Sequence, residues 1–272
     1  MVKQRLIFTL LYNNGNFVLS RNFRLQRVGN LRWLQKNYDF SKISFSIDEL
    51  VVLDVTRSER NIEAFCQALQ KLTEGCFVPI AAGGGITTME HAQALFRSGA
   101  DKIVVNTHVH EDSGLISEIA KDYGQQSLIA SMDVKKASDG QYAVHVESGE
   151  RPLDGAVTTW IDKALQAPVG ELYLNSMVQD GTGQGYDLAM LDHLPEKVEK
   201  PIILAGGAGN SSHLAEGLAD PRVDAVATAH LFNFVGDGLK KARLSLIDGG
   251  VDIPTWDVGL LENRATISVA DA

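Results

Sequence analysis

The stretch AAGGGITTMEHAQALFRSGADKIVVNT (residues 81–107) decides the fold, because the chain contains it twice. The second version, LAGGAGNSSHLAEGLADPRVDAVATAH, occupies residues 204–230. Matching positions lie 123 residues apart, among them Gly84 with Gly207. Each copy reads as an apolar run, a glycine turn, a helix and a second apolar run, which is one strand–helix–strand unit.

The repeat extends upstream of both copies. ELVVLDV (49–55) and ELYLNSM (171–177) match at a spacing of 122 residues. The second half of the chain therefore reads as a copy of the first, shifted by four strands. A closed barrel accommodates such a duplication naturally.

Eight short apolar runs without strict alternation predict strands that are buried on both faces. They cover 6–11, 49–55, 79–83, 102–107, 127–134, 171–177, 201–207 and 224–229. With helices between them, they predict an α/β protein, a single (β/α)8 TIM barrel built from two half-barrels over residues 1–260. An open, doubly wound sheet is the alternative, and the internal repeat argues against it. We expect residues 261–272 to form a flexible tail.

Helical patterns follow several of these strands. They cover 61–72, 87–99, 187–194 and 211–218. For the second of them, Thr87 is the expected N-cap, with Glu90 three residues further on, and Gly99 is the expected stop.

Two insertions follow the first and fifth strands. Residues 13–30 read as a long polar loop, which we interpret as a mobile lid. Residues 135–152 read as a small hairpin turning at Asp139-Gly140. Both lie at the carboxyl ends of the strands, where TIM-barrel enzymes build their sites.

The composition limits the class of protein. The 272 residues are 44% hydrophobic and carry a net charge of −9, which disfavours a nucleic-acid-binding face. No apolar run approaches the roughly 20 residues of a membrane span, and the N-terminus shows no signal-peptide pattern. Two cysteines, Cys66 and Cys76, indicate a reducing compartment, and we expect a cytoplasmic protein. Cys66 falls on an apolar helix stripe and reads as a buried thiol.

Two glycine turns predict phosphate sites. GGG (83–85) and GGAG (206–209) each end a strand and precede a helix. Glycine lets the backbone approach an anion, and the following helix supplies free N–H groups. The alternative is a tight turn with no ligand. We expect Gly84, Gly85, Gly206 and Gly207 to contact a phosphorylated small molecule.

Polar residues at other strand ends complete the predicted mouth. Asp133 ends the fifth strand and is a candidate general acid or base. Asp180 is equally well read as a turn aspartate before Gly181. The remaining polar strand ends are Asp54, Asn106, Thr107, Asn175 and Ser176. His108 and His110 have no third metal ligand near them in the sequence, so a polar loop is expected there, with neither metal nor cofactor.

Together these motifs resemble one family, the cyclase subunit of imidazole glycerol phosphate synthase. The resemblance covers residues 5–260, through DELVVLDV, AAGGGI, GADKIVVNT, MDVKK, NSMVQDGTGQGYD and LAGGAG. It implies a TIM barrel that takes ammonia from a glutaminase partner through its interior. It also implies a bis-phosphorylated substrate, with ligand contacts that include Ser148, and two catalytic carboxylates at the ends of strands one and five.

The resemblance carries the second carboxylate to Asp133 and leaves the first without a match. Leu11 stands where the family has its aspartate, Leu19 where a lid lysine is expected, and His230 where a small hydroxyl residue is expected. Leucine cannot be ionised, so a pKa shift cannot restore the lost function.

At the opposite end the resemblance is complete. It implies an ammonia gate formed by Arg5, Glu49, Lys102 and Glu171, with Asp101 at the glutaminase interface. The alternative is that the four charges only stabilise the barrel end through salt bridges.

Three functional interpretations follow. The first is a barrel that channels ammonia from a glutaminase to an acceptor, with a third protein forming an acetamidino sugar for surface polysaccharide, as in a divergent branch that shares Leu-Leu in strand one. The second is an authentic cyclase (a lyase of histidine biosynthesis) whose replacement carboxylate is Asp54 or Asp180. The third is a barrel that only binds and activates the glutaminase.

Overall fold

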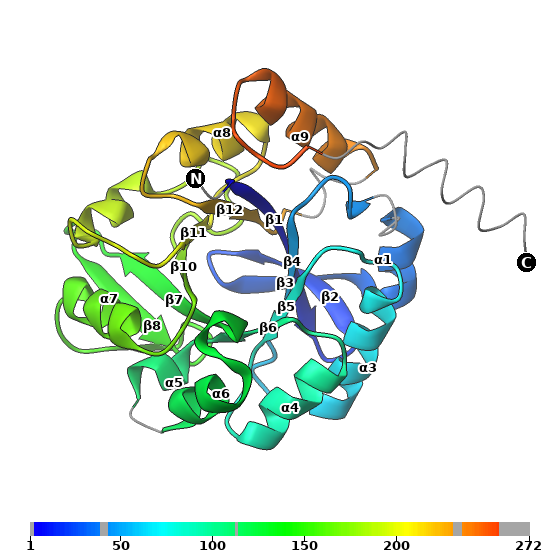
Figure 1. Ribbon diagram of the computed structural model, residues 1–272, viewed down its shortest axis with the longest axis horizontal. Helices are drawn as coiled ribbons and strands as arrows, with labels where there is room; N and C mark the ends of the chain where they lie inside the picture. The colour runs from blue at the N-terminus through cyan, green and yellow to red at the C-terminus, as the bar shows by residue number, and fades with distance from the viewer. Residues whose placement is uncertain (1–2, 39–42, 112–113, 231–235, 256–272) are drawn as a thin grey trace, which may run out of the picture.

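The computed structural model describes residues 3–38, 43–111, 114–230 and 236–255 and forms a closed barrel (Figure 1). Eight parallel strands follow one another in the order β1-β4-β5-β6-β7-β10-β11-β12. β12 pairs with β1, and β7 pairs with β10, so the described sheet has no break around the barrel. The prediction of a TIM barrel is confirmed, and the open sheet is excluded.

All eight predicted strands are present. Their bounds are β1 Arg5–Asn13, β4 Glu49–Asp54, β5 Ile80–Gly83, β6 Lys102–Val105, β7 Leu128–Lys136, β10 Glu171–Ser176, β11 Ile202–Ala205 and β12 Ala225–Thr228. Each barrel strand ends within two residues of its predicted end. The strand β6 ends two residues early because Thr107 begins a helix. The tail predicted for 261–272 lies outside the described residues.

Helices surround the barrel in Figure 1. They are α1 Leu31–Asn37, α3 Ile62–Thr73, α4 Met89–Arg97, α5 Thr107–His110, α6 Leu115–Tyr123, α7 Val157–Gln166, α8 Ser211–Ala219 and α9 Gly238–Asp248, with short 3₁₀ turns η1 Gln125–Ser127 and η2 Leu188–His193. Cys66 is 9% exposed on the inner face of α3, as predicted.

Three local predictions are wrong. The N-cap of α4 is Thr88 rather than Thr87, because it is the Thr88 side chain that accepts a hydrogen bond from His91 N. The segment 187–194 forms a 3₁₀ turn instead of an α-helix. The segment from His108 to His110 belongs to the short helix α5 and is not a polar loop.

Alternation along the strands assigns each side chain to one of two cores. On β1 the even-numbered residues from Leu6 to Tyr12 pack outward against the helices. Ile7 packs inside the barrel with residues of the other strands. By the same period of two, Arg5, Thr9 and Leu11 also face the barrel interior. The two ends of this inward row therefore lie at opposite ends of the barrel.

The insertion after β1 is not a loop, and this corrects the sequence prediction. β1 turns through Asn14-Gly15 into β2 (Asn16–Arg21), which pairs antiparallel with β1. β2 turns through Asn22-Phe23 into β3 (Arg24–Asn30). Both turns have two residues at positive φ, which is the geometry of tight hairpins.

The second insertion forms the predicted hairpin. β7 continues beyond the barrel and pairs antiparallel with β8 (Tyr142–Val146). Gly140 has φ of +86° in the intervening turn. A short strand β9 (Arg151–Pro152) then pairs with β8. Among the described residues, no helix is both long and apolar enough to cross a lipid bilayer.

Candidate functional site

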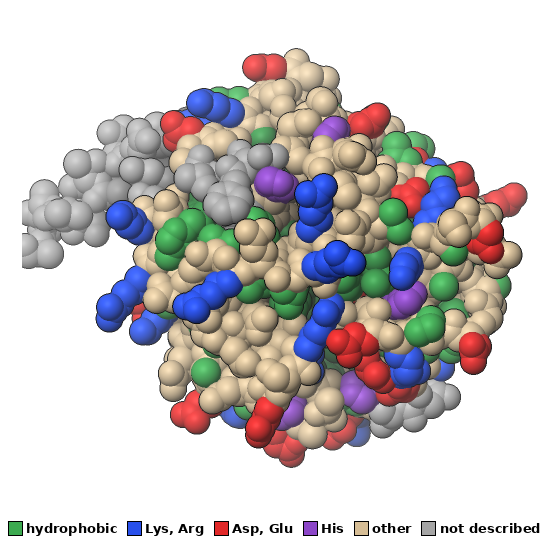
Figure 2. All heavy atoms as spheres, turned by 180° about the vertical axis from the view of Figure 1, so that it is seen from behind, with side chains coloured by type: hydrophobic (Ala, Val, Ile, Leu, Met, Phe, Trp, Pro, Cys, Tyr) green, Lys and Arg blue, Asp and Glu red, His purple; other side chains and the backbone are tan. Residues whose placement is uncertain are grey.

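A cavity of about 790 Å³ opens at the carboxyl ends of the barrel strands. This volume is in the range typical of small-molecule sites. Figure 2 views the molecule from behind Figure 1, and Lys and Arg side chains gather around the middle of this face. The predicted catalytic and ligand-binding residues all line the cavity, namely Gly84, Gly85, Asn106, Thr107, Asp133, Ser148, Asp180, Gly181, Gly206 and Gly207. Of the other polar strand ends, Asp54 and Asn175 also line it, whereas Ser176 is buried outside the lining. The structure thus brings the predicted site residues together, while their roles toward a ligand remain predictions.

Asp133 faces this cavity and is held by two amides. Asn106 Nδ2 donates to one carboxylate oxygen at 2.9 Å, and Asn175 Nδ2 donates to the other at 2.8 Å. Burial, together with the charge of Asp180, raises the pKa of Asp133 to about 6, although the hydrogen bonds from Asn175 and Asn106 act in the opposite direction. A carboxyl group with this pKa exchanges protons near neutral pH, as a general acid or base requires.

Leu11 lies on the opposite side of the mouth from Asp133. Both side chains line the cavity, and β1 and β7 are four strands apart in the ring of eight. Their numbers differ by 122, the spacing of the internal repeat. The fold therefore offers two equivalent places for a catalytic carboxylate, and this chain fills one of them with an apolar side chain.

The other candidate carboxylates are already engaged. Asp54 Oδ1 accepts a hydrogen bond from Thr56 N at 3.0 Å, in the turn that follows β4. Asp180 Oδ2 accepts from Ser20 Oγ at 2.5 Å and from Phe23 N at 2.9 Å. Asp180 therefore anchors the tip of the β2–β3 hairpin, and burial raises the pKa of its carboxyl group.

The glycine turns are required by backbone packing. A Cβ atom on Gly84 would lie 2.1 Å from Asp54 O, and one on Gly207 would lie 1.9 Å from Gly185 O. Both residues also have positive φ, +105° and +112°. The tight-turn interpretation thus holds at these two positions, and it is compatible with an anion above the turns. His230 and Leu19 lie on the cavity wall, as expected from the resemblance.

Sequence reasoning missed Arg57 and Arg60, which also line the cavity. They come from the loop between β4 and α3, in the segment TRSER (56–60). The signal was available, because two basic residues immediately after a barrel strand face the mouth in this fold.

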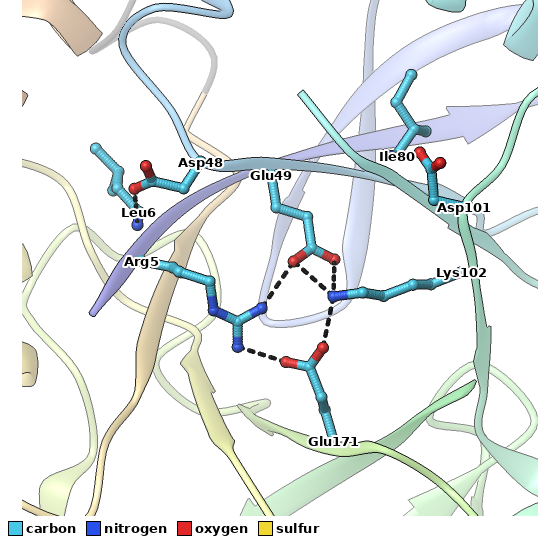
Figure 3. Close-up of polar contacts among 8 residues, drawn as sticks. All are labelled: Arg5, Leu6, Asp48, Glu49, Ile80, Asp101, Lys102 and Glu171. Carbon is cyan, nitrogen blue, oxygen red and sulfur yellow. Dashed lines mark hydrogen bonds and ion pairs between the residues drawn. The ribbon is translucent and has the colours of Figure 1, made fainter. Parts of the chain in front are cut away.

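A closed ring of ion pairs lies at the other end of the barrel (Figure 3). Arg5 pairs with Glu49 at 2.9 Å and with Glu171. Lys102 pairs with Glu49 at 3.0 Å and with Glu171 at 2.5 Å. The glutamates are almost fully buried, whereas the two cationic side chains are 19% exposed. The four residues predicted as a gate therefore form one neutral, alternating cluster.

Asp101 has a structural contact at this end. Its Oδ2 accepts a hydrogen bond from Ile80 N at 2.8 Å, at the start of the neighbouring strand (Figure 3). Asp224, its counterpart in the repeat, accepts from Ile202 N at 2.9 Å in the same way. The carboxylate thus satisfies a strand-end N–H group, and its proposed contact with a partner comes in addition to this role.

The geometry defines the class: a (β/α)8 barrel with a carboxylate-bearing cavity at the carboxyl ends of its strands and a charged ring at the other end. The profile of the family described as histidine biosynthesis protein matches residues 33–236. The chain belongs to this family.

Individual relatives agree with this assignment. A protein of Parasynechococcus marenigrum with the provisional name imidazole glycerol phosphate synthase subunit hisF2 is 47% identical over 89% of this chain and 90% of its own length. The imidazole glycerol phosphate synthase subunit HisF of Chlorobaculum tepidum is 35% identical over 93% of this chain and 99% of its own length. The resemblance to the cyclase subunit is thereby confirmed, and the chain is homologous to that subunit along nearly its whole length.

Proposed function

We propose that this chain is the barrel subunit of a cytoplasmic glutamine amidotransferase complex that delivers ammonia to a phosphorylated acceptor other than the cyclase substrate. The observation that carries the proposal is Leu11, which faces Asp133 across the mouth where a second carboxylate would be needed. The acceptor belongs to acetamidino-sugar formation, in which a third protein takes part.

The distance between the ring and the cavity supports a conduit. On β6 the ring residue Lys102 is followed at the next inward position by Val104, which lines the cavity. On β10 the ring residue Glu171 is followed in the same way by Tyr173. Two residues of a strand span about 6–7 Å, so one layer of side chains separates the ring from the cavity floor. After one ion pair of the ring opens, ammonia would have this one layer of side chains left to pass before it reaches the cavity.

The surface around the ring end supports a protein partner. Phe77 precedes β5 at this end, and its side chain is 74% exposed. Its ring stacks on Phe45 with the centroids 6.4 Å apart. Phe77 therefore offers one exposed apolar side chain beside the partly buried Phe45, which a partner surface would cover. A glutaminase that covers Asp101 and Phe77 would seal the ring from bulk water.

The second candidate is the authentic cyclase of histidine biosynthesis, which the 35% identity to HisF favours. It requires a second acid or base close to position 11. Asp54 and Asp180 are the candidate carboxylates for this role, and both already accept hydrogen bonds from neighbouring segments. Loss of a general acid or base costs about 100- to 10,000-fold in rate.

A reconstitution decides between these functions. The chain and its glutaminase are supplied with the bis-phosphorylated substrate of the cyclase, first with glutamine and then with an ammonium salt, and imidazole glycerol phosphate is measured. We expect product at less than about 1% of the rate of a HisF control with either nitrogen source. Product at the rate of the control would assign the protein to histidine biosynthesis.

The same complex tests the conduit against a barrel that only activates the glutaminase. Replacing Ala225, an inward-facing residue of β12, by Phe fills the barrel axis without removing a charge. We expect this variant to keep glutamine hydrolysis and to lose nitrogen transfer to the acceptor. Unchanged transfer would favour the purely activating role.

A further inference from the structure

We propose that Arg57 and Arg60 form a two-arginine clamp that binds a phosphate group of the ligand and holds the β2–β3 hairpin closed over it. The proposal rests on the proposed function, which supplies a phosphorylated acceptor. Both residues lie on the wall of the mouth cavity, beside the first glycine turn.

Arg60 lies directly on the glycine turn. A Cβ atom on Gly85 would be 2.4 Å from Arg60 Cδ and 2.9 Å from its Nε, so the missing side chain leaves the space that the arginine occupies. Arg60 Nη2 donates to Ser148 Oγ at 3.3 Å. Since a guanidinium group has five N–H donors, this single hydrogen bond leaves donors for an anion above the turn.

Arg57 connects the same place to the hairpin. Its Nη2 donates to Phe23 O at 2.7 Å and to Ser148 O at 3.3 Å. Its Nε lies 3.5 Å from a carboxylate oxygen of Glu150, a side chain that is 60% exposed. One guanidinium group thus joins the hairpin tip to the loop that follows β8, and its pairing with Glu150 is the weakest of these contacts.

The backbone at these contacts is held in an unfavourable conformation. Phe23, Glu147 and Ser148 have φ of +64°, +56° and +59°, a region that non-glycine residues seldom adopt. A Cβ atom on Gly149 would be 2.6 Å from the Phe23 ring, so the hairpin tip packs closely on the other loop. Strained residues of this kind persist where surrounding contacts hold them, and they cluster at ligand clamps.

A phosphate monoester fits this arrangement chemically. The glycine turn offers backbone N–H groups, and two guanidinium groups offer positive charge and paired donors that match phosphate oxygens. A phosphate dianion would replace Glu150 as the anion beside Arg57. Binding would therefore strengthen the contact between the two loops at the same time as it fixes the ligand.

Titration calorimetry with inorganic phosphate tests the clamp. We expect Arg60→Ala to weaken one phosphate site at least tenfold, Arg60→Lys to weaken it less, and Glu150→Gln to tighten it two- to threefold. Arg97→Ala, at an exposed position of α4 away from the cavity, is the matched control and should bind phosphate as the wild type does. Unchanged phosphate binding in Arg60→Ala, or no phosphate binding by the wild type, would overturn the proposal.

Limited trypsin digestion tests hairpin closure. In the wild type, phosphate should protect the peptide bonds after Arg21 and Arg24 from cleavage by trypsin. In Arg57→Ala, phosphate should no longer slow this cleavage. Equal protection in both proteins would show that Arg57 does not couple the ligand to the hairpin.

These measurements are independent of the acceptor. If the reconstituted complex forms imidazole glycerol phosphate efficiently, the proposed function fails while the phosphate titration still tests the clamp.

Discussion

A single side chain, Leu11, distinguishes the two functions proposed for this barrel. It occupies the position that is equivalent by the internal repeat to Asp133, and both face the same cavity. Because leucine has no proton to exchange, Asp133 is the titratable member of this pair of equivalent positions.

Leu11→Asp should add the second carboxylate. With Leu11 only 9% exposed, we expect the variant to lose about 1–3 kcal/mol of stability on burial of the polar group. In return, formation of imidazole glycerol phosphate from ammonium should rise at least tenfold above the wild-type level. Leu11→Asn is the control, because asparagine has nearly the same shape as aspartate but no carboxyl group. Equal rates for the Asp and Asn variants would show that position 11 does not supply an acid or base.

Asp133→Asn should change the pH dependence of stability. The pKa of Asp133 is raised to about 6 in the folded protein, so the folded state binds this proton more tightly than the unfolded state. The stability that protonated Asp133 contributes to the folded state is fully present below its unfolded pKa of about 4. This contribution is lost as the pH rises through about 6.

Relative to Asp133→Asn, the wild type should therefore lose about 2 kcal/mol between pH 4.5 and pH 8, measured by denaturant unfolding. Asp162→Asn, at an exposed position of α7, should show no such trend. A difference that does not depend on pH would mean that Asp133 is not desolvated.

At the scale of elements, the β2–β3 hairpin is the main departure from the sequence prediction. The Asn14-Gly15 pair is a strong signal for a two-residue hairpin turn, which the prediction of a polar loop over 13–30 does not use. The second turn could not be predicted, because Phe23 adopts a positive φ only in contact with Asp180, Arg57 and Gly149.

Asp180→Ala should release this hairpin from the barrel. The change removes the acceptor of two hydrogen bonds, from Ser20 Oγ and Phe23 N, so the tip should open more often. We expect trypsin to cleave after Arg21 or Arg24 about five to ten times faster than in the wild type. Asp162→Ala is the control. Identical cleavage rates would show that the contacts of Arg57 hold the tip without Asp180.

At the scale of the whole molecule, the charged ring and the mouth cavity lie at opposite ends of the barrel. The ring end is neutral and completely paired, whereas the mouth contains strained loops, a desolvated carboxyl group and uncommitted arginine donors. Rigid strands hold these ends in a fixed relation.

Glu171→Gln should show what the ring contributes. The change leaves Arg5 and Lys102 to share Glu49 in a partly buried place, so we expect a loss of about 2–3 kcal/mol in the free energy of unfolding. This loss should change little between low and high salt, because buried pairs are weakly screened. Glu199→Gln removes an exposed pair with Lys197 and should have no measurable effect. A loss that disappears in high salt would contradict a buried ring.

The barrel, its internal repeat and the position of each mouth residue along its strand follow from the amino-acid sequence alone. The reason is local: apolar runs, glycine turns and a period of two assign every strand residue to the interior or to the helices. Asp133 and the glycine turns could therefore be predicted from the pattern, whereas the four ring residues and the missing carboxylate at Leu11 were implied by the family resemblance.

Only the tertiary structure decided which side chains are committed to one another. Asp180 is bound to the hairpin, Asp101 to a strand end, and Arg60 to the first glycine turn. These contacts join residues from different loops, and the distance between loops depends on barrel closure and on backbone strain. No local pattern encodes that distance, which is why the contacts of Arg57 and Arg60 with Phe23, Ser148 and the glycine turn are visible only in the folded molecule.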